Sequence, residues 1–156
     1  MKRIKLTKGY YALVDDRDFV KLNKYKWQAE VQPDTVYAMR RPRIDGKSVT
    51  IKMHRQIMNT PKGIDTDHRD RNGLNNQRYN LRKCTRTQNN ANSKKRINNT
   101  SGIKGVCWDK NNNKWFAQIQ LHGKMIFLGR YTDKKKAAAA YAAAARKYFK
   151  KFARLT

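Results

Sequence analysis

Acidic residues are scarce in this sequence. Its 156 residues include 37 Lys and Arg but only 11 Asp and Glu, so the formal net charge is +26. Between Asp70 and Asp133 the only acidic residue is Asp109, while Lys and Arg recur throughout that stretch. So large a positive charge, spread along the chain and not confined to one tail, favours a polyanionic partner, and nucleic acid is the leading candidate.

Long apolar runs are absent as well. No stretch is long enough to span a bilayer, and the N-terminal MKRIKLTKGYY lacks the apolar middle of a secretion signal. No basic amphipathic helix with a strong apolar face is evident, which argues against binding at a membrane surface. We therefore expect an intracellular protein that is not secreted and has no membrane partner.

Cysteine is rare, and the two residues present, Cys84 and Cys107, lie far apart with no C-x-x-C pair and no cluster of histidines nearby. This spacing argues against a zinc finger, and a reducing compartment makes a disulfide unnecessary. The length suits one medium domain or two small ones and not one large enzyme core.

Short elements succeed one another along the first two thirds of the chain. Strand-like runs lie at 10–14, 35–40 and 48–53, with a hairpin turn at 44–47, and helical patterns lie at 15–27, 53–59 and 85–97. Asp15, Asp16 and Asp18 favour the start of the first helix. The helix at 85–97 is polar almost all round, so we expect it to gain stability from packing or from a ligand.

The C-terminal third has a clearer pattern. Three strand-like runs, IKGVCWD, KWFAQIQL and KMIFLGRY, are followed by an alanine-rich helix that starts near Thr132. Along the middle run, one face carries Trp115, Ala117, Ile119 and Leu121, and the other carries Lys114, Phe116, Gln118 and Gln120. We expect the first face to pack on the helix and the second to meet DNA, although a protein-interaction or RNA-binding module would also fit.

Asp67 and His68 stand side by side at the start of a stretch rich in asparagine and arginine. Phosphodiester cleavage needs a general base with a near-neutral pKa, which histidine offers, and oxygen ligands for a hard cation. If 64–68 and 81–85 pair as antiparallel strands, their loop returns Asn80 to His68. The helix that follows can pass Asn89 across the same point. Taken alone, an Asp-His pair is more often a surface ion pair.

The wider pattern resembles a known nuclease motif. It consists of Asp67-His68, Asn72, Leu74, Asn76, Asn80-Leu81 and Gln88-Asn89-Asn90. These residues look like the HNH endonuclease motif of the phage and intron homing type, in which asparagine replaces the last histidine. The resemblance covers about residues 50–92, including Met53-His54-Arg55, and implies a ββα-metal site of two strands, a helix and one divalent cation.

The resemblance also implies a role for each site residue. Asp67 and Asn89 would hold Mg²⁺, with Mn²⁺ as the alternative, and His68 would activate the attacking water. Asn80 would fix the loop and orient His68 from behind. DNA phosphate contacts are expected from Arg55, Arg69 and Arg71.

Residues 101–149 are similar to the plant apetala-two, or ethylene-response-factor, DNA-binding domain. The matches are Lys104-Gly105-Val106, Lys114-Trp115, Ile126-Phe127-Leu128-Gly129 and the alanine-rich helix ending near Tyr148. In that family, arginines and a tryptophan on the sheet make most DNA contacts. Here those positions carry Lys104, Cys107, Gln118, Gln120, Met125 and Phe127, so the family's sequence preference does not carry over. We expect Lys104, Gln118, Gln120 and Phe127 to contact DNA.

Together these features predict an α+β chain in three parts. Residues 1–62 form a strand and helix region packed with the nuclease core, 63–97 the HNH ββα-metal motif, and 98–156 a three-stranded antiparallel sheet on one helix. The predicted function is metal-dependent hydrolysis of double-stranded DNA in a bacterial or phage-infected cytoplasm, by a monomer, giving 5′-phosphate and 3′-hydroxyl ends. The competing hypothesis is a non-catalytic DNA-binding protein built on an HNH scaffold.

Overall fold

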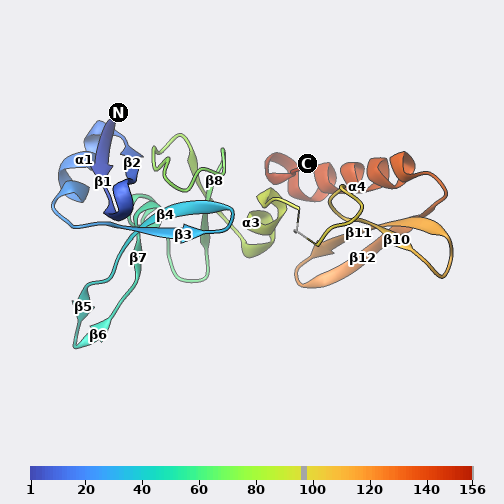
Figure 1. The fold of residues 1–156 in the computed structure, drawn as a ribbon, viewed down its shortest axis with the longest axis horizontal. Coiled ribbons are helices and arrows are strands. Elements are labelled where there is room, and N and C mark those ends of the chain that lie inside the picture. Colours follow the sequence, from blue (N-terminus) through green and yellow to red (C-terminus); the bar gives the residue numbers. More distant parts are fainter. Residues whose placement is uncertain (96–97, 156) are drawn as a thin grey trace. The chain divides into compact units, whose positions relative to one another are not determined.

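Small antiparallel sheets and short helices make up the fold in the computed structural model, which describes residues 1–95 and 98–155 (Figure 1). This confirms the α+β class. The chain divides into two compact units, Met1–Thr85 and Arg86–Thr156. Within the described residues, none of the helices is both long and apolar enough to cross a membrane.

The first unit is a succession of hairpins joined by short helices. Its strands are β1 (Lys2–Lys5), β2 (Tyr11–Val14), β3 (Gln28–Gln32), β4 (Thr35–Arg40), β5 (Arg43–Ile44), β6 (Lys47–Ser48), β7 (Ile51–Lys52), β8 (Asp65–His68) and β9 (Leu81–Cys84). Its helices are the 3-10 turn η1 (Thr7–Gly9), α1 (Asp16–Asn23) and α2 (Met53–Met58). The sheets are β1-β2, β3-β4-β7, β5-β6 and β8-β9, all with antiparallel pairing.

The core of this unit collects alternate residues of its strands and the inner faces of its helices. Its buried side chains are Ile4, Leu6, Ala12, Val14, Leu22, Trp27, Ala29, Ala38, Met53, Ile57 and Leu81. Leu81, at the start of β9, belongs to this cluster, and it pairs with His68 at the end of β8. Packing of Leu81 in the core therefore fixes the strand end at which His68 lies.

Helix α1 begins at Asp16 as the aspartates predict, but two of these carboxylates also have a distant partner. Asp15 accepts a hydrogen bond from the backbone N–H of Arg78 at 2.9 Å, and Asp18 forms a bidentate ion pair with the Arg78 guanidinium at 2.7 Å. The pKa of Arg78 is raised by its hydrogen bond to Asp18. These contacts hold the loop between β8 and β9 against α1.

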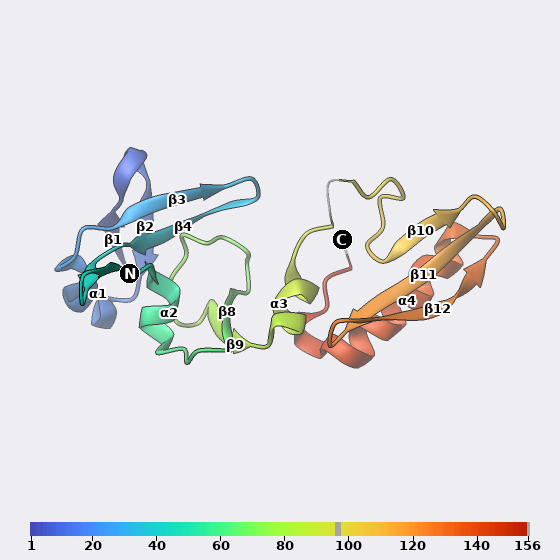
Figure 2. The same cartoon turned by 90° about the horizontal axis from the view of Figure 1, so that it is seen from below.

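The second unit consists of a sheet, β10 (Val106–Asp109), β11 (Lys114–Leu121) and β12 (Lys124–Tyr131), with helix α4 (Lys134–Phe149) packed on one face (Figure 2). It also contains α3 (Arg86–Asn92) and the 3-10 turn η2 (Lys150–Phe152). Asp133 caps α4 by accepting from the N–H of Lys135. The predicted three-stranded sheet on one helix is present.

Glycine and alanine let α4 approach this sheet closely. Gly105 has a φ of +73°, and a Cβ built there would lie 2.1 Å from the ring of Tyr141, which is buried on α4. Ala137, Ala144 and Ala145 are buried on the same helix. Small side chains at these positions therefore set the separation between helix and sheet, and Gly105 satisfies both a steric and a conformational requirement.

Helix α3 is shorter than the sequence pattern suggests, and it belongs to the second unit. It spans Arg86–Asn92 and contacts η2 and α4. The boundary between units therefore precedes this helix, whereas the sequence pattern placed a boundary after residue 97; the end of the predicted segment, 96–97, lies outside the described residues. Contacts with distant residues of the C-terminal module decide this division, and local sequence composition does not reveal them.

Candidate active site and nucleic-acid interface

Asp67 and His68 occupy the last two positions of β8 and are almost fully buried, at 6% and 4% exposure. In the antiparallel register Asp67 lies opposite Arg82, and His68 lies opposite Leu81. The predicted pairing of 64–68 with 81–85 is therefore observed as β8 with β9. A buried carboxylate and a buried imidazole are costly unless they have partners, so the neighbours of each define the site.

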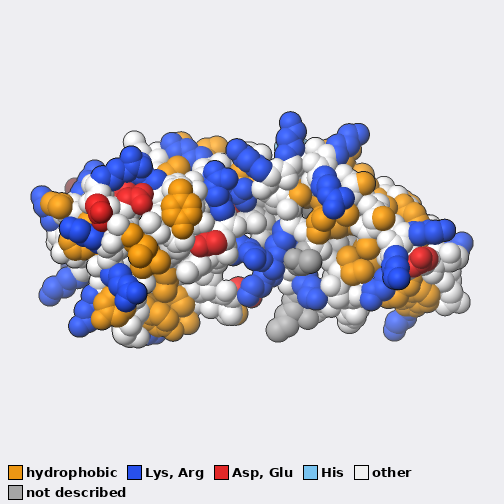
Figure 3. Space-filling model, turned by 90° about the horizontal axis from the view of Figure 1, so that it is seen from above, with side chains coloured by type: hydrophobic (Ala, Val, Ile, Leu, Met, Phe, Trp, Pro, Cys, Tyr) orange, Lys and Arg blue, Asp and Glu red, His pale blue; other side chains and the backbone are white. Residues whose placement is uncertain are grey.

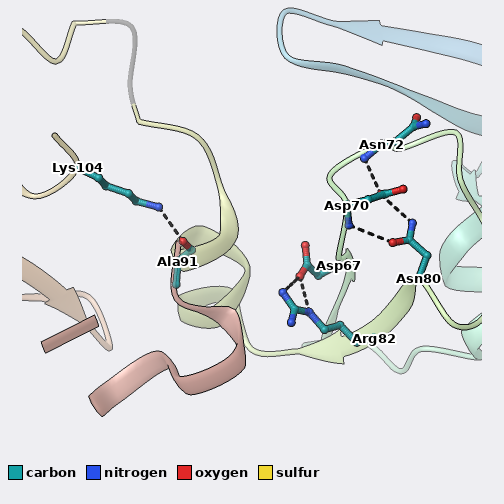
Figure 4. Close-up of polar contacts among 7 residues, drawn as sticks. All are labelled: Asp67, Asp70, Asn72, Asn80, Arg82, Ala91 and Lys104. Carbon is teal, nitrogen blue, oxygen red and sulfur yellow. Dashed lines mark hydrogen bonds and ion pairs between the residues drawn. The ribbon is translucent and has the colours of Figure 1, made fainter. Parts of the chain in front are cut away.

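Arg82 is the partner of Asp67 on the facing strand. Its Nε and Nη2 atoms each lie 2.7 Å from Oδ2 of Asp67, and the other carboxylate oxygen points away from Arg82 (Figure 4). Both side chains are buried. Arg82 thus compensates the buried carboxylate charge. Arg82 was not among the predicted site residues, although pairing of 64–68 with 81–85 places it directly across from Asp67.

His68 is held by Asn76. Its Nε2 lies 3.4 Å from Oδ1 of Asn76, whose amide nitrogen donates to the carbonyls of Gly73 and Leu74. Because the Asn76 amide nitrogen is used as a donor, its oxygen is the acceptor and His68 donates from Nε2. In the neutral ring Nδ1 is then unprotonated.

Burial is the largest influence on the charge of His68. It lowers the pKa of His68, while the hydrogen bond to Asn76 and the carboxylates of Asp70 and Asp67 act in the opposite direction. The ring is therefore neutral near pH 7, which is the form a general base requires.

Asn80 secures the loop through Asp70. Its side chain accepts from the Asp70 N–H at 3.0 Å and donates to Oδ1 of Asp70 at 2.8 Å (Figure 4). It also donates to the Asn75 carbonyl at 2.8 Å. Asp70 also accepts from the Asn72 N–H and from the Asn75 side chain. His68 thus donates a ring hydrogen bond to Asn76, and the expected role of Asn80 in orienting His68 stays a prediction.

The same loop is attached to the edge of β2. The N–H of Leu13 donates to the Leu74 carbonyl, and the N–H of Asn76 donates to the Leu13 carbonyl, both at 2.8 Å. Together with the contacts of Asp15 and Asp18, these bonds fix the backbone of Asn76 and therefore the acceptor that holds His68.

A second histidine lies next to His68. The His54 and His68 rings meet edge to face with centroids 5.0 Å apart, and Tyr37 lies 5.5 Å and 5.8 Å from them. His54 is buried and its Nδ1 has no hydrogen-bond partner among the described residues. Burial, assisted by the positive charges of Lys52 and Arg55, holds the pKa of His54 well below its usual range.

Three arginines were predicted to contact phosphate, and they differ in surroundings. Arg69 and Arg71 are exposed immediately after His68, and the Arg71 backbone N–H donates to the His68 carbonyl. The Arg55 guanidinium instead donates to the carbonyls of Thr60, Pro61 and Ile64. Arg55 therefore secures the turn after α2 in this structure, while Arg69 and Arg71 are exposed to solvent.

An exposed aromatic side chain, Tyr79, lies on the same loop and was missed by the sequence analysis. It is 69% exposed, and its hydroxyl accepts from the Asn75 side chain. A large exposed aromatic ring flanked by Arg78 and Asn80 offers a surface on which a base can stack.

A carboxylate oxygen is the kind of ligand that a hard cation takes. Mg²⁺ is commonly bound by one or two carboxylates and completes its coordination with water and substrate phosphate. Asp67 has a carboxylate oxygen that is not directed at Arg82. Within 1–95 and 98–155 no group of three or more His, Cys, Asp and Glu residues could by itself hold a metal ion. Asn89 lies on α3, in the second unit, while Asp67, His68 and Asn80 come together in the first.

The open face of the C-terminal sheet carries Gln118 and Gln120, as the alternation along 114–121 predicts, and Phe127 lies on the same face. Gln118 pairs with Phe127 and Gln120 with Met125 across β11 and β12, after a bulge that follows Ala117. Phe127 and Met125 are both more than half exposed. Gln118 and Gln120 also line a pocket of about 740 Å³ that is bordered by α3 and contains side chains of Arg86, Asn90 and Lys94.

Lys104 has a structural role that was not predicted. Its ammonium group donates to the carbonyls of Asn90, Ala91 and Ser93 at 2.8–3.0 Å, and burial lowers the pKa of Lys104 to about 8. Figure 4 shows the bond to Ala91. All three N–H donors are used by the C-terminal end of α3. Lys104 therefore caps this helix in the structure, and its contact with DNA stays a prediction.

Basic side chains also cover much of the surface. On the face drawn in Figure 3, Lys and Arg are spread over both units and acidic side chains are few. The charge of +26 thus belongs to folded surface, in agreement with the distribution along the sequence.

Comparison with known proteins adds one relative. The chain is 41% identical over 64 residues to Protein 3.8 of Escherichia phage T7, a match that covers 41% of this chain and 53% of that protein. The chain therefore spans about half the length of this relative. No protein-family model matches the sequence, and no solved structure matches it.

Proposed function

We propose that this protein is a metal-dependent endonuclease of double-stranded DNA, of the HNH homing type. The observation that carries the proposal is the buried Asp67–His68 pair at the end of β8, in which Asn76 holds a neutral His68. An uncharged imidazole beside a carboxylate supplies a base and a cation ligand at one point.

In the proposed mechanism, His68 accepts a proton at Nδ1 from the water that attacks phosphorus. The new bond is from the water oxygen to phosphorus, and the bond to the 3′ oxygen breaks. The released 3′ oxygen takes a proton from solvent, which leaves 5′-phosphate and 3′-hydroxyl ends. Arg69 and Arg71 hold phosphates beside the scissile bond. Asp67 and Asn89 would hold Mg²⁺ or Mn²⁺, which supplies positive charge against the phosphate in the transition state.

The C-terminal module would select the DNA. In the apetala-two-like arrangement that we propose, Gln118, Gln120 and Phe127 face the major groove, where amides hydrogen-bond base edges and apolar groups touch thymine methyls. The open face of the sheet and its exposed Phe127 and Met125 support this role.

One observation favours a second candidate, a DNA-binding protein without catalysis. Arg82 already compensates the charge of Asp67 at 2.7 Å, and a carboxylate satisfied by a guanidinium attracts a cation less strongly. In that case the Asp67–Arg82 pair would stabilise the β8-β9 hairpin and nothing more.

Incubation of supercoiled plasmid with the protein separates the two candidates. The endonuclease proposal expects nicked or linear product in Mg²⁺ or Mn²⁺ and none in excess chelator. Binding to DNA in the chelator with no cleavage in any divalent metal, over DNA of varied sequence, would leave the non-catalytic candidate.

A further inference from the structure

Residues 41–50 form a hairpin, here called the arm, that extends away from the rest of the first unit (Figure 1). Strands β5 and β6 pair Arg43 with Ser48 and Ile44 with Lys47, and the N–H of Val49 donates to the Pro42 carbonyl. Every residue of the arm except Pro42 is exposed. The arm therefore contributes no side chain to the core of the unit.

The tip of the arm is a rigid turn. Asp45 and Gly46 have φ values of +50° and +73°, the combination found in two-residue hairpin turns of type I′. At about 3.3 Å per residue, the four residues on each side of this turn span about 13 Å. An isolated two-stranded hairpin is only marginally stable in water, so a partner that covers it would stabilise it.

The two faces of the arm differ in character. The register places Arg41, Arg43, Ser48 and Thr50 on one face, and Pro42, Ile44, Lys47 and Val49 on the other. Ile44 and Val49 are 47% and 37% exposed. One face is therefore cationic and bears hydroxyl groups, and the opposite face exposes apolar side chains. A loop that only contacts water does not require this arrangement.

The positive charges of the arm have no counterpart nearby. The side chains of Arg41, Arg43 and Lys47 make no hydrogen bond or ion pair with any other described residue, and Asp45 is the single acidic residue in the arm. Arg40, at the base, is different, since it stacks on Tyr25 and bonds Gln56. The guanidinium groups beyond the base are thus available to an external anion.

We infer that the arm is a DNA-binding ribbon that enters the major groove, separate from both the nuclease site and the C-terminal sheet. A major groove about 12 Å wide and 8.5 Å deep admits a two-stranded ribbon. Ile44 and Val49 face the bases, where burial against thymine methyls removes their apolar surface from water. Arg41 and Arg43, on the opposite face, reach the phosphates at the edge of the groove. The inference rests on the proposed function only in taking DNA as the partner.

Equilibrium binding of the full-length protein to duplex DNA in excess chelator tests the arm without requiring cleavage. Arg41→Ser with Arg43→Ser should weaken binding to all sequences and lower the slope of log affinity against log salt by about 1.8, for two lost phosphate contacts. The matched control, Lys21→Ser with Lys24→Ser, removes two exposed charges at the C-terminal end of α1 and just after it, in the same unit, and should leave that slope near the parent value.

Ile44→Ser with Val49→Ser tests the apolar face separately. After selection from a randomised duplex pool, this variant should recover a less restricted set of sequences than the parent, with an unchanged salt slope, because base contacts specify and phosphate contacts position. Circular dichroism should show a native fold for each variant, since these side chains are exposed.

Three results would overturn the inference. The first is a slope of log affinity against log salt in the Arg41→Ser with Arg43→Ser variant that equals the slope of the parent. The second is an equal reduction of this slope in the Lys21→Ser with Lys24→Ser control, which would indicate a general effect of net charge. The third is that Ile44→Ser with Val49→Ser recovers the same set of DNA sequences as the parent from the randomised pool. That result would indicate that this face binds a protein and not DNA bases. If the parent cuts DNA and the arm variants bind DNA as tightly as the parent, the inference about the arm is rejected and the nuclease proposal stands. A parent that binds DNA through the arm but never cuts would reject only the nuclease proposal.

Discussion

Asn76 is the residue that fixes the tautomer of His68, and its contribution to cleavage can be measured. Asn76→Ala removes the acceptor at Nε2 while leaving Asp67 and Arg82 in place. We expect the cleavage rate to fall by about 100-fold, near the lower end of what a positioned general base supplies. DNA affinity should be within about twofold of the parent.

The matched control for this substitution is Asn111→Ala, in the exposed turn between β10 and β11. Thermal melting of both variants guards against misfolding, since loss of a buried amide costs roughly 1–3 kcal/mol. A parent cleavage rate in a folded Asn76→Ala protein would show that Asn76 does not position His68.

Burial of His54 makes stability depend on pH. The folded pKa lies below the unfolded value of 6.5, so below about pH 6.5 the unfolded chain binds a proton that the folded chain does not. The free energy of unfolding should therefore decline as the pH falls from 7 to 5. In His54→Phe, which keeps the ring contact with Tyr37, this decline should be smaller.

Chemical denaturation at pH 7 and pH 5 measures the effect, and comparison with the parent removes the contribution of the carboxylates. His122→Asn, in the turn at the tip of β11 and β12, is the control and should behave as the parent. An equal decline in the parent and in His54→Phe would refute the assignment to His54.

At the level of elements, Lys104 and helix α3 depend on each other. Lys104→Met keeps the length of the side chain but leaves three carbonyls without their donor. We expect the second unit to lose about 1–3 kcal/mol of stability and the amides of α3 to exchange faster with solvent. Lys110→Met, at an exposed position, should change neither. If the backbone amides of α3 exchange as slowly in Lys104→Met as in the parent, the capping role is contradicted.

The C-terminal elements were predictable because their cause is local. Alternation along β11 separates Ala117 and Ile119, which are buried, from Gln118 and Gln120, and turn residues mark both strand ends. The roles of Arg78, Arg82 and Lys104 were not predictable in this way. Each pairs with a group that is 11 to 60 residues away, and a basic residue in a basic chain carries no local sign of such a partner.

The difference between local and long-range contacts also explains which of the predicted site residues come together. Asp67, His68 and Asn80 come together because one hairpin and its loop contain all three. Helix α3, with Asn89, follows them directly in sequence but packs with η2 and α4. It belongs to the second unit because these elements lie after residue 97 in the sequence. A fragment ending near that residue would lack Lys104 and α4, so we expect it to keep a poorly ordered α3.

For the whole molecule, affinity and selectivity should be separable. Gln118→Ala with Gln120→Ala should reduce the ratio of specific to nonspecific affinity more than it reduces binding to random duplexes, because amides read base edges and contribute little to phosphate binding. The ratio is measured at one salt concentration for the parent and for the double variant. An unchanged ratio would place recognition elsewhere, with the arm as the next candidate.

The central claim is that His68 acts as the base of a DNA-cleaving site. The most direct measurement compares the parent with His68→Ala on supercoiled plasmid in Mg²⁺, with DNA binding measured in parallel. We predict that the parent nicks or linearises the plasmid, and that His68→Ala binds DNA with near-parent affinity yet leaves the plasmid supercoiled. Cleavage by His68→Ala at the parent rate, or a plasmid that the parent leaves intact in every divalent metal, would contradict the claim.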